Sequence, residues 1–398
     1  MFRFIHTSDW HLGQNFYGYD RSAEQRDFLQ QLAAIVAEQR PDALLVSGDV
    51  YHTPSPSNSA VSLYVKSMLD IHEACPEMAI IVIAGNHDSA ARLESDSLLW
   101  RLAGVTVLGG IARNGDGTAD LDRHLVRVGD KGIVAAVPFG YAANFPQIAG
   151  NTATRDQRQQ AYFQALLDRA AELNPDGLPV ALMAHLAVSG SNITGHDSTV
   201  LMDSVALNEL GTGYDYAALG HIHHPQQLSQ QARYCGTPLA VSFDEQCEHA
   251  VSLVEIATHG TTPVVSRHAI RNIRPLHTIP PTVPADFDSV MEQLQGISEE
   301  DAYVRLNVLV DGHLPHDAQT RAAQLLAEKH CRYCCIKRTL PATARPQGST
   351  MSLEQLSSKS PQDVANQYFA DKTGNPMSDL QRELFNEALQ QVLNGVRS

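Results

Sequence analysis

The segment Phe2–Phe16, FRFIHTSDWHLGQNF, begins as a buried strand and changes character within a few positions. Five of its first six residues could serve a buried strand, and we expect a strand at Phe2–Thr7. Asp9 and His11 follow it, and both side chain types bind divalent metal ions. Residues two apart on a strand point to the same side, so we expect both to face one crevice. Taken alone, the pair also fits a cap and a surface histidine.

The same arrangement recurs at four later strand ends, which favours the metal interpretation. Apolar runs at 42–48, 78–85, 179–184 and 216–220 each end in metal-binding side chain types. Glycines stand near the ligand positions in most of these segments, where they permit tight turns and close backbone approach. The candidate ligands are Asp9, His11, Asp49, Asn86, His185, His221 and His223.

The chemistry of these seven side chains indicates two ions rather than one. Asp, His and Asn without Cys suit intermediate or hard divalent ions such as Mn²⁺, Fe²⁺ or Zn²⁺ and do not indicate a thiolate site. Seven ligands are too many for one ion and fit two ions roughly 3.5–4 Å apart. Asp49 is the natural bridging ligand, because a carboxylate has two oxygens and each histidine has one available nitrogen.

The order of the expected elements predicts an α/β fold. Strands at 2–7, 42–48 and 78–85 alternate with helices at 22–39 and 59–72, which is a βαβαβ opening. Further strands follow with fewer helices between them, one exception being a helix within 155–172. We expect these strands to form a second, mixed sheet packed on the first: 124–128, 132–139, 179–185, 216–220 and 249–257.

Composition limits the possible classes of protein. The 398 residues are 43% hydrophobic, which is enough for a large core without disulfides. The net charge of −15 argues against a protein that coats nucleic acid, but bound cations or a local basic cleft can still receive phosphate. The six cysteines show no framework and indicate reduced thiols. We find no signal peptide or membrane-length apolar run and expect a cytoplasmic protein.

The C-terminal third changes in composition. Four prolines between Pro275 and Pro284 indicate a stiff linker. A helix, a strand, a helix and a strand are expected next, which is a small α+β unit. The tail at 378–393 has apolar residues at helical spacing, and we expect it to dock on a partner, the alternative being that it packs on its own domain. The expected domains are 1–274, 275–340 and 341–398.

The chain carries, in order, the motifs DxH, GDxxH, GNHD, a single strand-end His and GHxH. This set resembles the calcineurin-type metallophosphoesterases. Longer stretches, including TSDWHLGQNFYG, SGDVYHTPSPS, LGHIHHPQ and RYCGTPLAVSFDE, resemble the SbcD-type nuclease branch of that family, the bacterial counterpart of the double-strand-break repair nucleases. The likeness is strong over about residues 1–260. It implies a four-layer α/β/β/α sandwich with a small α+β capping domain and a C-terminal helical tail.

The resemblance also implies a role for each candidate residue. His87 would be the catalytic histidine, which stabilises developing charge and helps the leaving oxygen acquire a proton. His52 stands where the wider family commonly has Asp, and in the nuclease branch it is linked to positioning the phosphate. One ion would be held by Asp9, His11, Asp49 and His223, and the other by Asp49, Asn86, His185 and His221.

Neighbouring polar residues receive other interpretations. Asp88 is expected to cap a loop, and His196 with Asp197 is expected to lie in a solvated loop. The cations Arg267, Arg271, Arg274, Lys337 and Arg338 are candidates for phosphate contacts, with scattered surface charge as an equal alternative.

The activity that the resemblance implies is Mn²⁺-dependent exonuclease and endonuclease cleavage of DNA, including hairpin ends, in repair and recombination. The partner in this family is an SMC-like ATPase, SbcC, with the nuclease as a homodimer within a heterotetramer. The sequence has no GxxxxGK[ST], so any use of ATP requires that partner.

Two other functions stay open. A small-substrate phosphomonoesterase or phosphodiesterase would use the same metals, although the LGQNFYG loop, His52 and the C-terminal additions favour a nuclease. A non-catalytic scaffold is the other alternative, and the presence of all seven ligands together with His87 argues against it.

Overall fold

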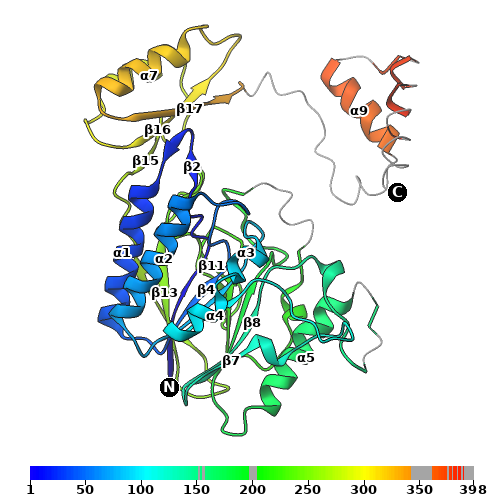
Figure 1. The fold of residues 1–398 in the computed structure, drawn as a ribbon. Coiled ribbons are helices and arrows are strands. Elements are labelled where there is room, and N and C mark those ends of the chain that lie inside the picture. Colours follow the sequence, from blue (N-terminus) through cyan, green and yellow to red (C-terminus); the bar gives the residue numbers. More distant parts are fainter. Residues whose placement is uncertain are drawn as a thin grey trace. The chain divides into compact units, whose positions relative to one another are not determined.

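The computed structural model describes residues 1–150, 153–154, 157–196, 204–341, 361–373, 376–378, 380–382, 384–386 and 389 (Figure 1). The chain divides into two compact units. The first is Met1–Leu276 with Asp301–Tyr303, and the second is His277–Glu300 with Val304–Ser398. The predicted domain boundaries at 274 and 340 stay predictions.

The first sheet has six strands in the order β14-β13-β1-β4-β5-β6. β1, β4, β5 and β6 are parallel to one another. On the other side of β1, β13 pairs antiparallel with β1, and β14 pairs antiparallel with β13. The strands are β1 (Phe2–Thr7), β4 (Ala43–Ser47), β5 (Ala79–Ile83), β6 (Val105–Leu108), β13 (Ala250–Ile256) and β14 (Val264–Ala269).

The second sheet also has six strands, in the order β11-β12-β10-β9-β8-β7. Its four central strands are parallel, and the two outer strands are antiparallel to their neighbours. The strands are β7 (Leu125–Val128), β8 (Gly132–Val137), β9 (Val180–His185), β10 (Tyr216–Gly220), β11 (Gln226–Gln227) and β12 (Ala232–Tyr234).

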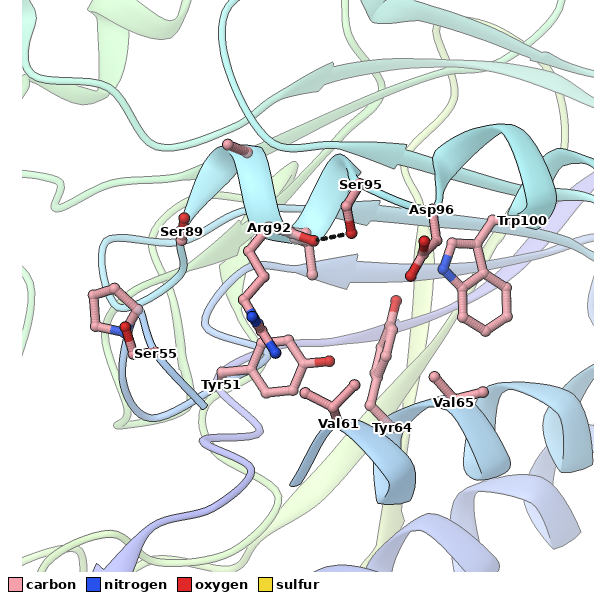
Figure 2. A pocket seen from close by; sticks show the side chains of 13 residues that line it. Tyr51, Ser55, Val61, Tyr64, Val65, Ser89, Arg92, Ser95, Asp96 and Trp100 are labelled. Atoms are coloured by element: carbon pink, nitrogen blue, oxygen red, sulfur yellow. Dashed lines mark hydrogen bonds between the residues drawn. The ribbon is translucent and has the colours of Figure 1, made fainter. Parts of the chain in front are cut away.

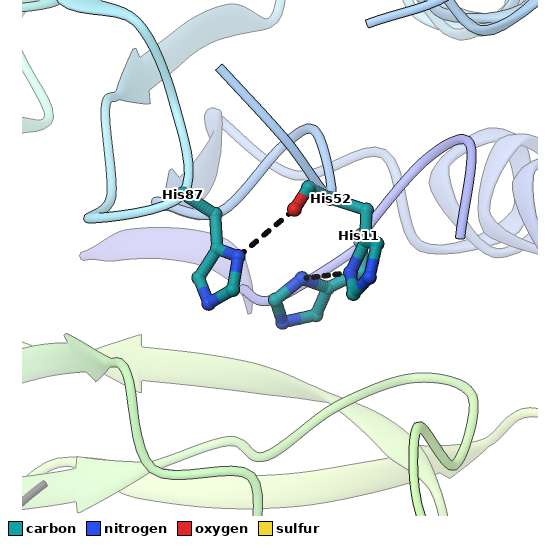
Figure 3. Close-up of side chains that lie close together, drawn as sticks. All are labelled: His11, His52 and His87. Carbon is teal, nitrogen blue, oxygen red and sulfur yellow. Dashed lines mark hydrogen bonds between the residues drawn. The ribbon is translucent and has the colours of Figure 1, made fainter. Parts of the chain in front are cut away.

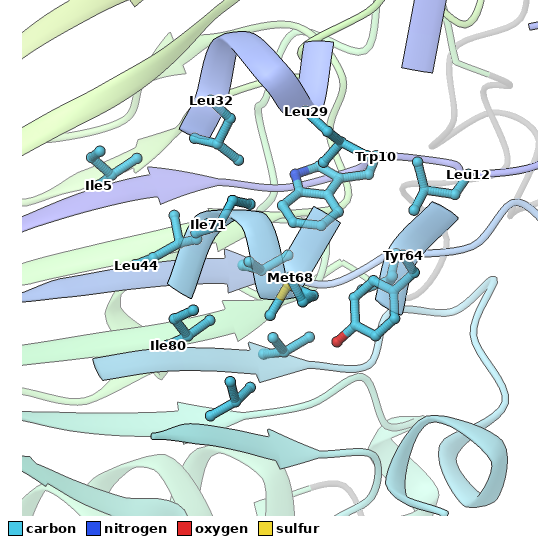
Figure 4. Close-up of a cluster of buried hydrophobic side chains, with 14 of the residues drawn as sticks. Ile5, Trp10, Leu12, Leu29, Leu32, Leu44, Tyr64, Met68, Ile71 and Ile80 are labelled. Atoms are coloured by element: carbon cyan, nitrogen blue, oxygen red, sulfur yellow. The ribbon is translucent and has the colours of Figure 1, made fainter. Parts of the chain in front are cut away.

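Three buried clusters hold four layers together. One cluster fills the space between the first sheet and the helices α1 (Ser22–Gln39) and α2 (Asn58–Ala74) and includes Leu32 and Met68 (Figure 4). The second joins the two sheets, and the third joins the second sheet to α5 (Arg158–Glu172). Strand alternation divides the side chains, so that Leu44 faces the helices and Leu45 faces the other sheet. The expected four-layer sandwich is confirmed.

The predicted elements of residues 1–257 match the structure closely, with one correction. Residues 249–257 were expected in the second sheet, but β13 pairs antiparallel with β1 in the first. The edge of a parallel sheet at β1 leaves backbone groups unpaired, and β13 satisfies them. The shorter elements are β2 (Asn15–Phe16), β3 (Tyr19–Asp20), α3 (Ala90–Glu94), α4 (Ser97–Trp100), η1 (Arg101–Ala103), η2 (Asp122–His124), η3 (Ala142–Asn144) and η6 (Leu207–Leu210).

The second unit has the expected mixed α and β composition. Its sheet has the order β15-β16-β17, and its helices α6 (Phe287–Gln295) and α7 (Ala318–Glu328) bury Val290, Leu294 and Leu326 completely. A helix at 361–373 lies in the region for which C-terminal helices were expected. Most of the predicted tail helix at 378–393 lies outside the described residues. The elements are β15 (Leu276–Ile279), α6 (Phe287–Gln295), β16 (Tyr303–Leu309), α7 (Ala318–Glu328), β17 (Arg332–Thr339) and α9 (Pro361–Thr373).

Within the described part of the chain, no helix has both the length and the apolar character needed to cross a lipid bilayer.

Candidate metal centre

The carboxyl ends of β1 and β4 in one sheet meet those of β9 and β10 in the other. Ser47, the last residue of β4, donates its hydroxyl to the carbonyl of Ala218 in β10 at 3.0 Å. At this junction, Asp9, His11 and His223 have ligand atoms within 4.8 Å of one another, as do Asp9, Asp49 and His185. All five of these side chains are buried. The structure therefore brings strand ends from both sheets to one polar centre.

Asp49 lies between two halves of this centre, one around His11 and the other around His185. Its Oδ2 is 3.7 Å from Nε2 of His11, and its Oδ1 is 3.6 Å from Nε2 of His185. Each carboxylate oxygen thus faces a different histidine, which is the arrangement that a bridging ligand between two ions requires.

The remaining predicted ligands complete the two halves. On the His11 side, Nε2 of His11 lies 3.2 Å from Nε2 of His223. On the His185 side, Oδ1 of Asn86 lies 3.0 Å from Nε2 of His185 and 2.8 Å from Nδ1 of His221. All seven predicted ligands are therefore in the centre.

The outer ring nitrogens of two histidines are held by hydrogen bonds. Nδ1 of His185 donates to the carbonyl of Ser47 at 2.8 Å, and Nδ1 of His223 lies 3.2 Å from Oε1 of Glu245. A neutral imidazole that donates from Nδ1 keeps its lone pair on Nε2. Both Nε2 atoms therefore present lone pairs to the centre, as metal ligands must.

The DxH pair reaches the centre by a different route from the one expected. β1 ends at Thr7, so Asp9 and His11 lie in a loop and not on one face of a strand. Both have positive φ, 56° and 46°, and Asp49 and His221 also have positive φ, 50° and 100°. Such conformations cost non-glycine residues of order 1–3 kcal/mol each and are concentrated at functional sites. Backbone hydrogen bonds from Asp9 to Gly48 and from His11 to Asp49 hold the two loops together.

Two glycines allow the loops to approach closely. A Cβ on Gly48 would lie 2.2 Å from Nδ1 of His185, and a Cβ on Gly85 would lie 2.1 Å from Oδ1 of Asp49. Any larger side chain would displace a predicted ligand, so glycine is needed at both positions for steric reasons.

Burial makes the charged forms of these groups costly. It raises the pKa of the Asp9 carboxyl well above its usual value, and the charge of nearby Asp49 raises it further. It lowers the pKa of His185 to about 3 and that of His221 to about 2. Neutral imidazoles and crowded, poorly solvated carboxylates are the groups that a divalent cation stabilises. The donor set and its arrangement therefore fit two divalent ions.

The predicted catalytic histidines lie beside the His11 half of the centre (Figure 3). Nδ1 of His87 donates to the carbonyl of His52 at 2.9 Å, and the two rings are stacked with centroids 5.7 Å apart. The ring of His87 is also 4.9 Å from that of His11.

Asp88 accepts backbone N–H bonds from Val50, Tyr51 and Gly85. It therefore ties the loops together, as expected for a capping residue.

Sequence reasoning missed two residues of the centre. His196 was expected in a solvated loop, but its ring lies 3.8 Å from that of His223, and its Nε2 accepts the backbone N–H of His223 at 2.9 Å. Glu245 is buried and also binds Thr237 through Oε2 at 2.8 Å. Glu245 stands in the quoted stretch RYCGTPLAVSFDE, so an acidic residue ending that stretch was the available signal. Asp197 lies outside the described residues.

Two of the five candidate phosphate-binding cations are engaged elsewhere. Arg267 pairs with Glu248, and Arg274 pairs with Glu24 and Asp301. Both side chains already pair with carboxylates, which favours the alternative of scattered surface charge over phosphate contacts for these two residues.

We expect Glu245→Gln to weaken Mn²⁺ binding by about 10- to 100-fold, because the carboxylate no longer holds Nδ1 of His223. Isothermal titration calorimetry measures this on the purified chain. The matched control is Glu248→Gln, which changes a surface carboxylate on the same segment. Equal affinities for wild type and Glu245→Gln would show that Glu245 does not orient the ligand.

Comparison with known proteins agrees with this geometry. Residues 2–225 match the calcineurin-like phosphoesterase family, and residues 272–373 match the family described as the type 5 capsule protein repressor C-terminal domain.

Three relatives are named as the D subunit of the nuclease SbcCD. That of Rhodobacter capsulatus is 36% identical over 271 residues, 64% of this chain and 66% of the relative. That of Escherichia coli K12 is 28% identical over 382 residues, 92% of each chain, and that of Bacillus subtilis is 31% identical over 253 residues, 61% of this chain and 63% of the relative. The chain thus spans just under two thirds of the first and third relatives. The expected resemblance to this branch is confirmed, and the chain belongs to the calcineurin-like phosphoesterase family.

Proposed function

We propose that this chain is the nuclease subunit of an SbcCD-type complex and hydrolyses DNA phosphodiester bonds with two Mn²⁺ ions. The observation that carries the proposal is the position of Asp49, whose two oxygens face His11 and His185. The names of the relatives support a nucleic acid as the substrate, and the resemblance to the double-strand-break repair nucleases favours DNA. The proposed activities are exonuclease and endonuclease cleavage of DNA ends and hairpins in repair and recombination.

The proposed ligand sets follow the two halves of the centre. When bound, two cations would supply positive charge to the non-bridging phosphate oxygens and activate water as the nucleophile. We assign Asp9, His11, Asp49 and His223 to one ion and Asp49, Asn86, His185 and His221 to the other.

His87 is the proposed general acid. Its Nδ1–H bond to the carbonyl of His52 fixes the ring, and in the imidazolium form its Nε2–H can give a proton to the leaving oxygen. His52 is half-buried, its ring is stacked on His87, and its Nδ1 lies 3.5 Å from Nδ1 of His11. We propose that His52 positions both His87 and the phosphate.

The nuclease assignment includes a proposed ATPase partner. An SMC-like ATPase, SbcC, would supply ATP-dependent activity, because the sequence contains no GxxxxGK[ST]. The C-terminal helices beyond residue 340 are the proposed contact with it. The proposed site of action is the cytoplasm, where bacterial DNA lies.

The nuclease assignment predicts Mn²⁺-dependent cleavage of single-stranded and hairpin-ended DNA that EDTA abolishes. His87→Gln should lower kcat by about 10²- to 10⁴-fold, because the leaving oxygen loses its proton donor. The control is His313→Gln, at an exposed histidine of the second unit, and p-nitrophenyl phosphate is assayed in parallel.

The alternatives have distinct outcomes in the same assay. Intact DNA with a hydrolysed monoester would support the small-substrate phosphoesterase. Turnover of neither substrate, even with the ATPase partner present, would support the non-catalytic scaffold.

A homodimer is the proposed assembly state of the nuclease. Leu98, Leu99 and Leu102 are 74%, 68% and 87% exposed, an unusual concentration of apolar side chains within five residues. Beside them Trp100 joins Val61 and Val65 of α2 in the lining of a pocket of about 580 Å³ (Figure 2). A second copy of this chain would cover this apolar surface.

We expect the wild-type chain to sediment with twice the mass of one chain and Leu98→Glu/Leu102→Glu to sediment as a monomer. Burying two carboxylates in an apolar interface is strongly unfavourable. Val264→Glu is the control, because Val264 is 64% exposed on the edge strand β14. A monomeric wild type, or a double variant that stays dimeric, would contradict this interface.

A further inference from the structure

We propose that Tyr141, braced by Phe139, is a stacking platform for a base of the DNA strand whose phosphate occupies the metal centre. This inference rests on the proposed nuclease function and adds to it a binding site for the nucleobase.

The backbone places this aromatic pair next to the His185 half of the centre. Phe139 follows β8, and its N–H donates to the carbonyl of Ala84 at 2.9 Å. Ala84 directly precedes Gly85 and Asn86, so this bond attaches the aromatic segment to the loop that carries a proposed ligand. Like the centre, the segment is therefore positioned by both sheets, since Phe139 follows β8 of the second sheet and Ala84 follows β5 of the first.

The rings form a row that leads outward from the ligands. The ring of Phe139 is 6.4 Å from that of His221 and 6.2 Å from that of His185. The ring of Tyr141 is 5.1 Å from Phe139 at an interplanar angle of 77°. Phe139 is half-buried, whereas Tyr141 is 59% exposed. Phe139 therefore acts as the support, and Tyr141 offers the open face.

Gly140, between Phe139 and Tyr141, lets the backbone lie close to Ile111. A Cβ on Gly140 would lie 2.7 Å from Cδ1 of Ile111. The apolar contact with Ile111 therefore sits behind the segment, on the protein side, while the Tyr141 ring stays open to solvent.

The negative charge of the chain makes uncharged contacts with DNA, such as base stacking, useful for binding. The chain has a net charge of −15, and Arg267 and Arg274 are engaged with carboxylates. Contacts other than phosphate charge would then add to the affinity for a DNA strand. Stacking of bases on aromatic side chains contributes about 1–3 kcal/mol per base and tolerates any base, because every base has a π-face. A tyrosine one ring beyond Phe139, which itself lies near His185 and His221, suits a nuclease that cuts ends of any sequence.

The test is a cycle of two protein variants and two oligonucleotides. Wild type and Tyr141→Ala are each measured with a fluorescent oligothymidylate and with an oligonucleotide of the same length built from abasic tetrahydrofuran residues. Anisotropy in EDTA gives Kd without metal, and cleavage in Mn²⁺ gives KM and kcat. Tyr141→Phe keeps the ring and Tyr141→Leu keeps only apolar bulk. Thermal melting checks that each variant folds.

Tyr141→Ala should raise Kd and KM for oligothymidylate by about 5- to 150-fold, with no effect on the abasic strand. Tyr141→Phe should behave as wild type, and Tyr141→Leu as Tyr141→Ala. If Tyr141→Ala binds and cleaves oligothymidylate as well as wild type does, the platform is excluded while the nuclease assignment stands. If wild type neither binds nor cleaves oligothymidylate, the proposed function fails, and this inference fails with it.

Discussion

The centre depends on one carboxylate. Asp49 is 1% exposed, and each of its oxygens faces a histidine from a different sheet: His11 follows β1, and His185 ends β9. Without a cation, two neighbouring buried carboxylates repel one another, and the burial of Asp9 raises its pKa. The same side chains become favourable together when divalent charge lies between them. The packing of the two sheets therefore has a direct chemical consequence, because it fixes the separation of the two ligand sets.

The surrounding structure is built to hold that carboxylate still. The backbone N–H of His87 donates to Oδ1 of Asp49 at 2.9 Å, and Gly85 leaves room for that oxygen. Asp88 binds three N–H groups of the adjoining loops. Positive φ at Asp9, His11 and Asp49 shows that the loops adopt conformations that only a rigid surrounding can maintain. The apolar clusters on both sides of the first sheet supply that rigidity.

Much of this could be predicted from the sequence, because strands and amphipathic helices leave periodic patterns. Phe2–Thr7 and Ser22–Gln39 have the predicted bounds, and the seven candidate ligands after the strands lie close together. The sequence could not show that Asp9 and His11 lie in a loop with positive φ. A strand and such a loop can both bring the two side chains of a DxH pair to one side. Nor could it place β13 beside β1, since pairing partners far apart in sequence leave no periodic signal. His196 and Glu245 were not predicted for a similar reason. Their contacts with His223 depend on the paths of loops, which leave no periodic pattern in the sequence.

The most direct test of the central claim is the number of Mn²⁺ ions that one chain binds, measured by calorimetry for wild type and Asp49→Asn. Asp70→Asn, on the exposed surface of α2, serves as the control. A bridging Asp49 predicts two ions per chain in wild type and in the control, and the loss of at least one in Asp49→Asn, with a folded protein by circular dichroism. One ion in wild type, or two ions bound with unchanged affinity by Asp49→Asn, would contradict the account.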